Sequence, residues 1–135
     1  MSFSGDLLPH LPVDAQAAAY GRATGRRYDF GPMLAPMRPV VGAVDVGVCH
    51  MEVPVAPDGR PSGYPSFGAP RELVDGAASV GFDGCSTASN HSLDRGSAGV
   101  KATLDEFDRV KLRHAGTGRN AWEAGSALYV VRGVK

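Results

Sequence analysis

The sequence is poor in cysteine, has no excess of either charge and lacks long apolar runs. Its two cysteines, Cys49 and Cys85, are too few for a disulfide framework and lack the spacing of a metal-binding pair. Both lie in apolar segments, which favours buried free thiols over a bridge. Lys plus Arg and Asp plus Glu balance at 14 each, so no overall field draws the chain to nucleic acid or anionic lipid. The Arg26–Arg27 pair is by itself too short for a basic patch.

No apolar run approaches the ~20 residues that a membrane-spanning helix needs, and the first residues lack the basic and apolar regions of a signal peptide. We therefore expect neither a membrane span nor an export signal in this chain. Hydrophobic residues make up 43% and charged residues 21%, which is typical of a folded globular protein. The 18 glycines and 10 prolines predict short elements joined by many turns.

Strand-like and helix-like segments alternate along the chain. The predicted strands are 1–6, 44–51, 82–88, 112–115 and 127–131. The predicted helices are 14–20, 69–80, 97–110 and 120–124, with broken helical turns over 32–41. Asp14 is the expected N-cap of the first helix, and the Pro/Gly-rich loop 53–68 is long enough to cover or line a site. The alternation predicts an α/β fold with a mostly parallel sheet and flanking helices.

Polar residues follow three of the predicted strands. Asp6 ends the first strand, Glu52 follows the second, and Asn90 and His91 follow the third. Ligands of open parallel sheets bind outside the carboxyl ends of the strands, and neighbouring strands lie ~4.8 Å apart, so these side chains are expected to converge. Carboxylate and amide oxygens suit manganese, iron, zinc or magnesium. We predict Asp6, Glu52 and Asn90 as metal ligands, with His91 as the catalytic acid or oxyanion donor.

Three other histidines are weaker candidates for the same site. His10 lies four residues past Asp6 and joins the site only if its loop folds back; a loop histidine between prolines is the favoured alternative. His50 shares a strand face with Glu52, and we expect it to position the metal ligands without contacting the metal itself. His114, at the end of a later strand, is a candidate to line the same cleft.

Each candidate also has a purely structural interpretation. Asp6 could belong to a turn, Glu52 to a solvated loop, and Asn90 could cap the turn that follows it. Their common position at strand ends favours the functional interpretation. Other chemistries fit worse, because the glycine-rich segment 116–120 has neither a third dinucleotide-binding glycine nor a P-loop lysine, and no Gly-x-Ser-x-Gly elbow is present.

Short segments spread along nearly the whole chain form a joint pattern. They are Gly5-Asp6, the run 44–54 ending in Glu52-Val53-Pro54, the loop 63–70, Gly81-Phe82-Asp83 leading to Ser89-Asn90-His91 and Asp94-Arg95-Gly96, and 116–120 followed by Glu123-Ala124. This pattern resembles the N-terminal part of bacterial CapA-type capsule (poly-γ-glutamate) synthesis proteins, which are related to calcineurin-like metallophosphoesterases. His50 stands where many members have Asn, and Ser89 where many have the first Asn of an Asn-Asn-His motif.

The resemblance implies the first half of a metallophosphoesterase-like α/β/β/α sandwich, so residues 1–135 are expected to be a partial domain without its C-terminal half. The family's later histidine-rich segments, which would supply further ligands, lie beyond this sequence. We therefore expect a weakly bound divalent metal and negligible activity in the isolated chain. For full-length relatives the resemblance implies a role in capsule or poly-γ-glutamate synthesis at the cell envelope or outside the cell. The implied partners are the polymer-synthesis machinery or an anionic polymer; a non-catalytic binding or scaffold role is the alternative.

Overall fold

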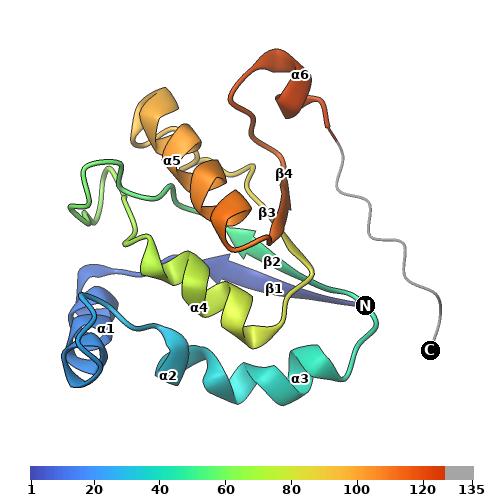
Figure 1. The fold of residues 1–135 in the computed structure, drawn as a ribbon. Helices are drawn as coiled ribbons and strands as arrows, with labels where there is room; N and C mark the ends of the chain where they lie inside the picture. The colour runs from blue at the N-terminus through green and yellow to red at the C-terminus, as the bar shows by residue number, and fades with distance from the viewer. Residues whose placement is uncertain (127–135) are drawn as a thin grey trace.

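The computed structural model describes residues 1–126, whose core is a sheet of four parallel strands (Figure 1). The strands are β1 (Ser2–Leu7), β2 (Gly47–Met51), β3 (Gly84–Ser86) and β4 (Arg113–Ala115). They lie in the sheet in chain order, β1-β2-β3-β4, and every neighbouring pair is parallel. The α/β fold with a parallel sheet predicted from the sequence is therefore confirmed. The predicted strand 127–131 lies outside the described residues.

Helical segments connect the strands. They are α1 (Leu11–Ala23), α2 (Gly31–Leu34), the 3₁₀ turn η1 (Ala35–Met37), α3 (Arg38–Gly42), α4 (Glu72–Val80), α5 (Gly96–Arg109) and α6 (Ala121–Ala124). The prolines of 32–41 break this stretch into α2, η1 and α3, as expected. Gly81, in the left-handed conformation with φ 97°, ends α4. No helix within residues 1–126 is long and apolar enough to span a bilayer.

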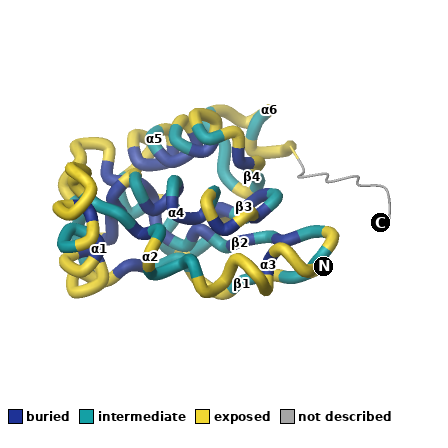
Figure 2. The backbone as a smooth tube through the Cα atoms, turned by 60° about the horizontal axis from the view of Figure 1, so that its bottom comes forward, coloured by how far each residue is buried: buried dark blue, intermediate teal, exposed yellow. Residues whose placement is uncertain are grey.

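The core lies between one face of the sheet and the helices α4 and α5, which cross in front of the sheet in Figure 1. Cys49, Met51 and Cys85 point into this core and are almost completely buried. The opposite face carries Phe3, which is 72% exposed, and the half-buried His50. Figure 2 shows buried residues along the inner side of α5 and mostly exposed residues in α1.

Two expectations need correction. Cys49 and Cys85 are buried as expected, but they form a disulfide instead of remaining free thiols. They are directly paired neighbours in β2 and β3, and their Cα atoms lie 4.3 Å apart. Asp14 is not the N-cap of α1: the helix begins at Leu11, because Pro12 fits the first turn where no amide donor is needed, and His10 takes the cap position. Asp14 therefore sits inside the first turn.

The long loop between β2 and α4 is fastened to the segment before α5. The Asp94 carboxylate accepts the Phe67 amide at 2.8 Å, and the Ser66 hydroxyl donates to the Asp94 carbonyl at 2.7 Å. The Arg95 guanidinium donates to Asp58 at 2.8 Å and to the Ser62 hydroxyl at 3.1 Å. These contacts fix a loop that is rich in Pro and Gly, so its side chains can serve as a wall of a site.

Candidate functional site

The carboxyl edge of the sheet, where β1, β2 and β3 end, brings the predicted site segments together. Asp6 is the register partner of His50, and Glu52 directly follows β2. Past β3, the Ser89 hydroxyl donates to the Glu52 carbonyl at 2.7 Å, which joins the Ser89–His91 segment to the end of β2. These contacts place the three strand-end segments at the same edge of the sheet, and the ligand roles of Asp6, Glu52 and Asn90 stay predictions.

An irregularity in β1 decides which way Asp6 faces. The register shifts between Phe3 and Asp6, so Asp6 pairs with His50. Without this bulge Asp6 would stand opposite Met51, whose side chain is buried in the core, because a one-residue slip moves a side chain to the other face. The bulge instead leaves the Asp6 side chain 60% exposed, with its Oδ1 3.9 Å from Nε2 of His50.

His50 is held from its other side by Ser86 of β3. Its Nδ1 lies 2.7 Å from the Ser86 hydroxyl oxygen, and the ring is only a quarter exposed. Asp6, His50 and Ser86 thus form a polar row across the ends of three adjacent strands. The predicted supporting role of His50 fits this row, in which it stands between the candidate ligand Asp6 and a hydroxyl.

His91 has the most constrained side chain of the predicted site. Its Nδ1 lies 2.8 Å from Oδ2 of Asp94, three residues further on. An ionised carboxylate can only accept a hydrogen bond. Nδ1 of His91 therefore carries a proton and donates a hydrogen bond to the Asp94 carboxylate. Nε2 is then the atom left for a ligand, since no hydrogen bond to it is found within the described part of the chain. The same Asp94 oxygen accepts the Phe67 amide, so the orienting carboxylate is itself fixed.

Phe67 places two of the candidate histidines in one cluster. The His91 ring meets the Phe67 ring edge to face with centroids 4.8 Å apart, and the His10 ring also meets it edge to face, at 5.4 Å. Phe67 is buried, whereas His10 is exposed. The α1 N-terminus therefore does fold back toward the carboxyl edge, which is the condition under which His10 was expected to join the site.

Glu52 carries the observation that bears most directly on a metal. Its Oε2 is buried and has no hydrogen-bond partner among residues 1–126. A buried carboxylate oxygen without a donor is costly unless a cation or a donor is supplied from outside, so Glu52 fits the role of a ligand. Over the same residues no group of three or more His, Cys, Asp or Glu side chains is gathered closely enough to hold a metal. The predicted set has only two carboxylates, its third donor being the exposed Asn90 amide, and it fits a weak site only.

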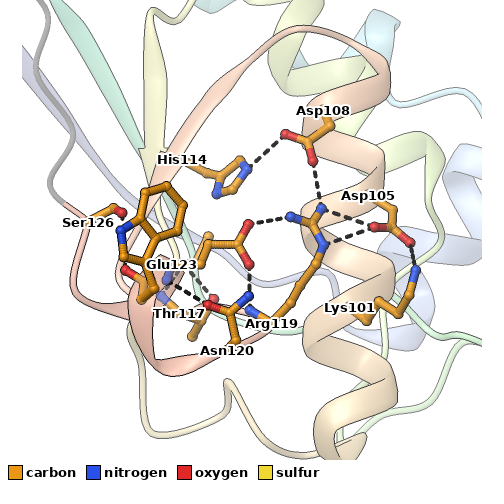
Figure 3. A network of polar contacts seen from close by, with 11 residues as sticks. Lys101, Asp105, Asp108, His114, Thr117, Arg119, Asn120, Glu123 and Ser126 are labelled. Carbon is orange, nitrogen blue, oxygen red and sulfur yellow. Dashed lines mark hydrogen bonds and ion pairs between the residues drawn. The ribbon is translucent and has the colours of Figure 1, made fainter.

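His114 lies apart from the other candidate residues, on the α5 side of the sheet. On β4 its Nε2 contacts Oδ1 of Asp108 at 3.1 Å, and its ring leans on Phe107 with centroids 5.7 Å apart. Figure 3 shows the ring turned toward α5, beside the Arg119 guanidinium that binds Asp105, Asp108 and Glu123. This contact network fastens the segment around α6 to α5. It gives His114 a structural partner on the α5 side of the sheet.

Sequence reasoning missed Asp94, Phe67 and Ser89 as site residues. Asp94 had a visible signal, because a carboxylate three residues after a histidine is within reach of its ring in a tight turn. Phe67 had none, since it comes from a loop 24 positions before His91 and only the folded loop brings it there.

Comparison with known proteins identifies the family of this chain. The model of the family described as bacterial capsule synthesis protein PGA_cap matches residues 1–135, which is the whole chain. No curated protein matches the chain closely enough to count as a relative. The chain therefore belongs to the family of bacterial capsule synthesis proteins.

Proposed function

We propose that this chain serves capsule synthesis by binding a phosphoester group together with a divalent cation at the carboxyl edge of its sheet. The buried, unpartnered oxygen of Glu52 is the observation that carries the proposal. It stands next to a segment whose histidine is already oriented by a carboxylate. Membership of the capsule synthesis family supplies the biological setting.

The roles of the residues follow from their contacts. Asp6, Glu52 and Asn90 would supply oxygen donors to manganese, iron, zinc or magnesium. When bound, such a cation neutralises charge on a phosphoryl group and lowers the pKa of water. His91 would donate a hydrogen bond or a proton from Nε2 to a phosphoryl or leaving oxygen, while Asp94 holds Nδ1 and so orients the ring.

The contribution of this chain to chemistry is expected to be small. Three oxygen donors, one of them on a largely exposed aspartate, bind a cation weakly. The proposed partners are the machinery that makes the capsule polymer, or the anionic polymer itself, which is poly-γ-glutamate by the resemblance described above. In the alternative role, as a non-catalytic binding or scaffold protein of the cell envelope, the same residues would bind without turnover.

Calorimetric titration with manganese chloride tests the cation site. We expect one weakly bound ion per chain and at least tenfold weaker binding in Glu52→Gln, since loss of even a supporting partner of a metal ligand typically costs 10–100-fold in affinity. Asp45→Asn is the control, because it removes the same charge from an exposed position between α3 and β2. Equal binding by Glu52→Gln and the unaltered chain would contradict the proposed site.

Hydrolysis of bis(p-nitrophenyl) phosphate with manganese tests the catalytic part. The expected rate is negligible, and His91→Ala should leave it so. Turnover that His91→Ala abolishes, or tight binding of two ions per chain, would show instead that the chain is a working enzyme. Manganese binding without any effect of phosphodiester on its affinity would favour the scaffold role.

A further inference from the structure

We propose that a second site, on the helical side of the molecule, binds a small oxyanion that carries several negative charges as phosphate or carboxylate groups. The site is an open cleft of about 930 Å³ between the α1–α2 loop, α2 and α4. Its walls include five arginines, Arg26, Arg27, Arg38, Arg71 and Arg109, against the three carboxylates of Asp29, Glu72 and Asp75. No residue of the carboxyl-edge site lines this cleft, so the inference goes beyond the proposed function and stands independently of it.

The positive charge of the cleft is assembled from four separate parts of the chain. Arg26 and Arg27 precede α2, Arg38 begins α3, Arg71 precedes α4, and Arg109 ends α5. The chain as a whole is neutral, with 14 basic and 14 acidic residues, so this concentration arises only from the fold. The five arginines outnumber the three carboxylates that line the cleft, and this excess of positive charge attracts an anionic ligand.

Three of the arginines have no carboxylate partner among the described residues. Within residues 1–126 the side chains of Arg26, Arg27 and Arg38 form neither an ion pair nor a hydrogen bond, although Arg27 stacks over the neighbouring Tyr28 ring at 5.4 Å. Arg119 shows the contrasting case in Figure 3, with three carboxylates around one guanidinium. Guanidinium groups that line a cleft without a protein acceptor are available to an external oxyanion, which they can bind through paired N–H donors.

The loop that carries Arg26 and Arg27 is fixed rather than loosely attached. The Arg26 amide donates to the Gly21 carbonyl at 2.8 Å, and the Asp29 amide donates to the Ala17 carbonyl at 2.9 Å. Gly21 allows the loop to pass this close to α1, because a Cβ at this position would lie only 2.7 Å from the Arg26 carbonyl oxygen. On the other side, Asp29 uses Oδ1 to accept the Gly31 amide at 2.8 Å, which occupies one of the few acceptors in the cleft.

The opposite wall holds Arg109 in place. Its guanidinium contacts Asp75 at 2.6 Å and Glu106 at 2.5 Å, and these two hydrogen bonds raise the pKa of Arg109 further. Arg71 is 62% exposed and makes a long ion pair with Glu106, at 3.9 Å, for which an anionic ligand can compete. The cleft thus combines one fixed guanidinium with four that can adjust, which suits a ligand with more than one anionic group.

The cleft continues into a second hollow of about 530 Å³, which shares Arg27 and Arg71 with it. At the junction the Arg27 guanidinium lies over Gly59: a Cβ there would be 3.4 Å from Nη1. The combined volume accommodates a ligand larger than one phosphate ion, which is why we assign a multiply charged small molecule.

Titration calorimetry of the full chain at low ionic strength tests the site, with pyrophosphate and tricarballylate as separate probes. We expect binding of at least one probe at a ratio of one per chain, and the stronger of the two identifies phosphate or carboxylate as the preferred group. The triple substitution Arg26→Gln/Arg27→Gln/Arg38→Gln should weaken that binding at least tenfold, since each exposed ionic contact typically contributes up to ~1 kcal/mol. Raising the salt concentration to 150 mM should also weaken it.

Arg22→Gln is the matched control, because Arg22 is an exposed arginine of α1 that likewise has no carboxylate partner in the described chain but does not line the cleft. It should change the affinity less than twofold. No saturable binding of either probe, or equal weakening by the control and by Arg27→Gln alone, would overturn the assignment. Circular dichroism of each variant establishes that it is folded. Manganese binding, measured in parallel, should be unchanged in the triple variant, which separates this site from the carboxyl-edge site.

Discussion

Asp14 offers the sharpest test of the fold, because its carboxyl group is buried without a partner. The residue is 4% exposed, and neither carboxyl oxygen has a hydrogen-bond partner among residues 1–126. Burial raises the pKa of Asp14 from 3.8 to about 7, since the charged form loses its hydration in the interior. Asp14→Asn keeps the shape of the side chain and removes the charge that the core does not accommodate.

The effect on stability has a definite sign. The folded chain retains the Asp14 proton to a higher pH than the unfolded chain does, so the free energy of unfolding falls as the pH rises from about 4 to about 7. The stabilisation is complete below the unfolded pKa and lost above the folded one. At ~1.4 kcal/mol per pKa unit, this one group should lower the free energy of unfolding by roughly 2–3 kcal/mol between pH 5 and pH 8.

Urea unfolding at pH 5, 6, 7 and 8 measures this directly. The substitution Asp14→Asn should remove the 2–3 kcal/mol loss, so that the stability of the variant relative to the unaltered chain increases by about that amount between pH 5 and pH 8. Asp45→Asn, at an exposed position, should change the free energy of unfolding by less than ~0.5 kcal/mol. If Asp14→Asn and the unaltered chain lose stability in parallel between pH 5 and pH 8, the carboxyl group is not buried as described.

Three further substitutions test the packing around the two sites by urea unfolding or hydrogen exchange. Gly21→Ala should lower the free energy of unfolding by about 1–3 kcal/mol, because its Cβ would collide with the returning α1–α2 loop, whereas Gly42→Ala, with open space around it, should change it by less than ~0.5 kcal/mol. Phe67→Ala should lower the free energy of unfolding by about 3 kcal/mol, because Phe67 is buried. Tyr64 is 83% exposed, so Tyr64→Ala should lower it by less than ~0.5 kcal/mol, and equal effects of the two substitutions would contradict the aromatic cluster. Arg119→Gln should speed amide exchange in α6 with little effect on the core, since its ion pairs join that segment to α5.

Much of the fold could be predicted because hydrophobic patterning and turn residues agree with each other. The apolar stripe of α5 and the glycine that ends α4 gave these two helices within a few residues of their bounds. Strand lengths were harder: the segment 82–88 has strand character throughout, yet β3 covers only Gly84–Ser86. A strand is limited by the length of its neighbours, and β4 also has three residues, which local sequence does not reveal.

The start of α1 was predicted wrongly for a different reason. Asp14 looks like a cap because a short acidic side chain before an alanine-rich run usually accepts backbone amides. Asp14 is instead buried without a hydrogen-bond partner among residues 1–126, and this burial arises from the folded structure and not from the sequence around Asp14. The same holds for the cysteines, whose pairing depends on the register of β2 with β3.

The candidate site divides in the same way. Asp6, Glu52 and the Asn90–His91 segment could be named in advance because each follows or ends a predicted strand. Their orientation could not, because it depends on the β1 bulge and on a loop that must first be fastened by Asp94. The arginine cleft could not be predicted from the sequence at all. It brings together charged residues that are separated by up to 83 positions, from Arg26 to Arg109, in a chain of zero net charge.

The two sites make opposite electrostatic demands, and the fold meets both by placing them on different elements. At the carboxyl edge, the Glu52 Oε2 oxygen is buried without a donor among residues 1–126, which favours a cation. In the cleft, guanidinium groups gather and three of them lack an acceptor among residues 1–126, which favours an anion. Had the two sets been adjacent, they would have paired with each other, as Arg119 does with the acids of α5. Their separation is therefore what leaves each able to bind a ligand from solution, and a variant that brought an acid into the cleft, such as Ser79→Glu, should reduce anion binding while leaving manganese binding unchanged.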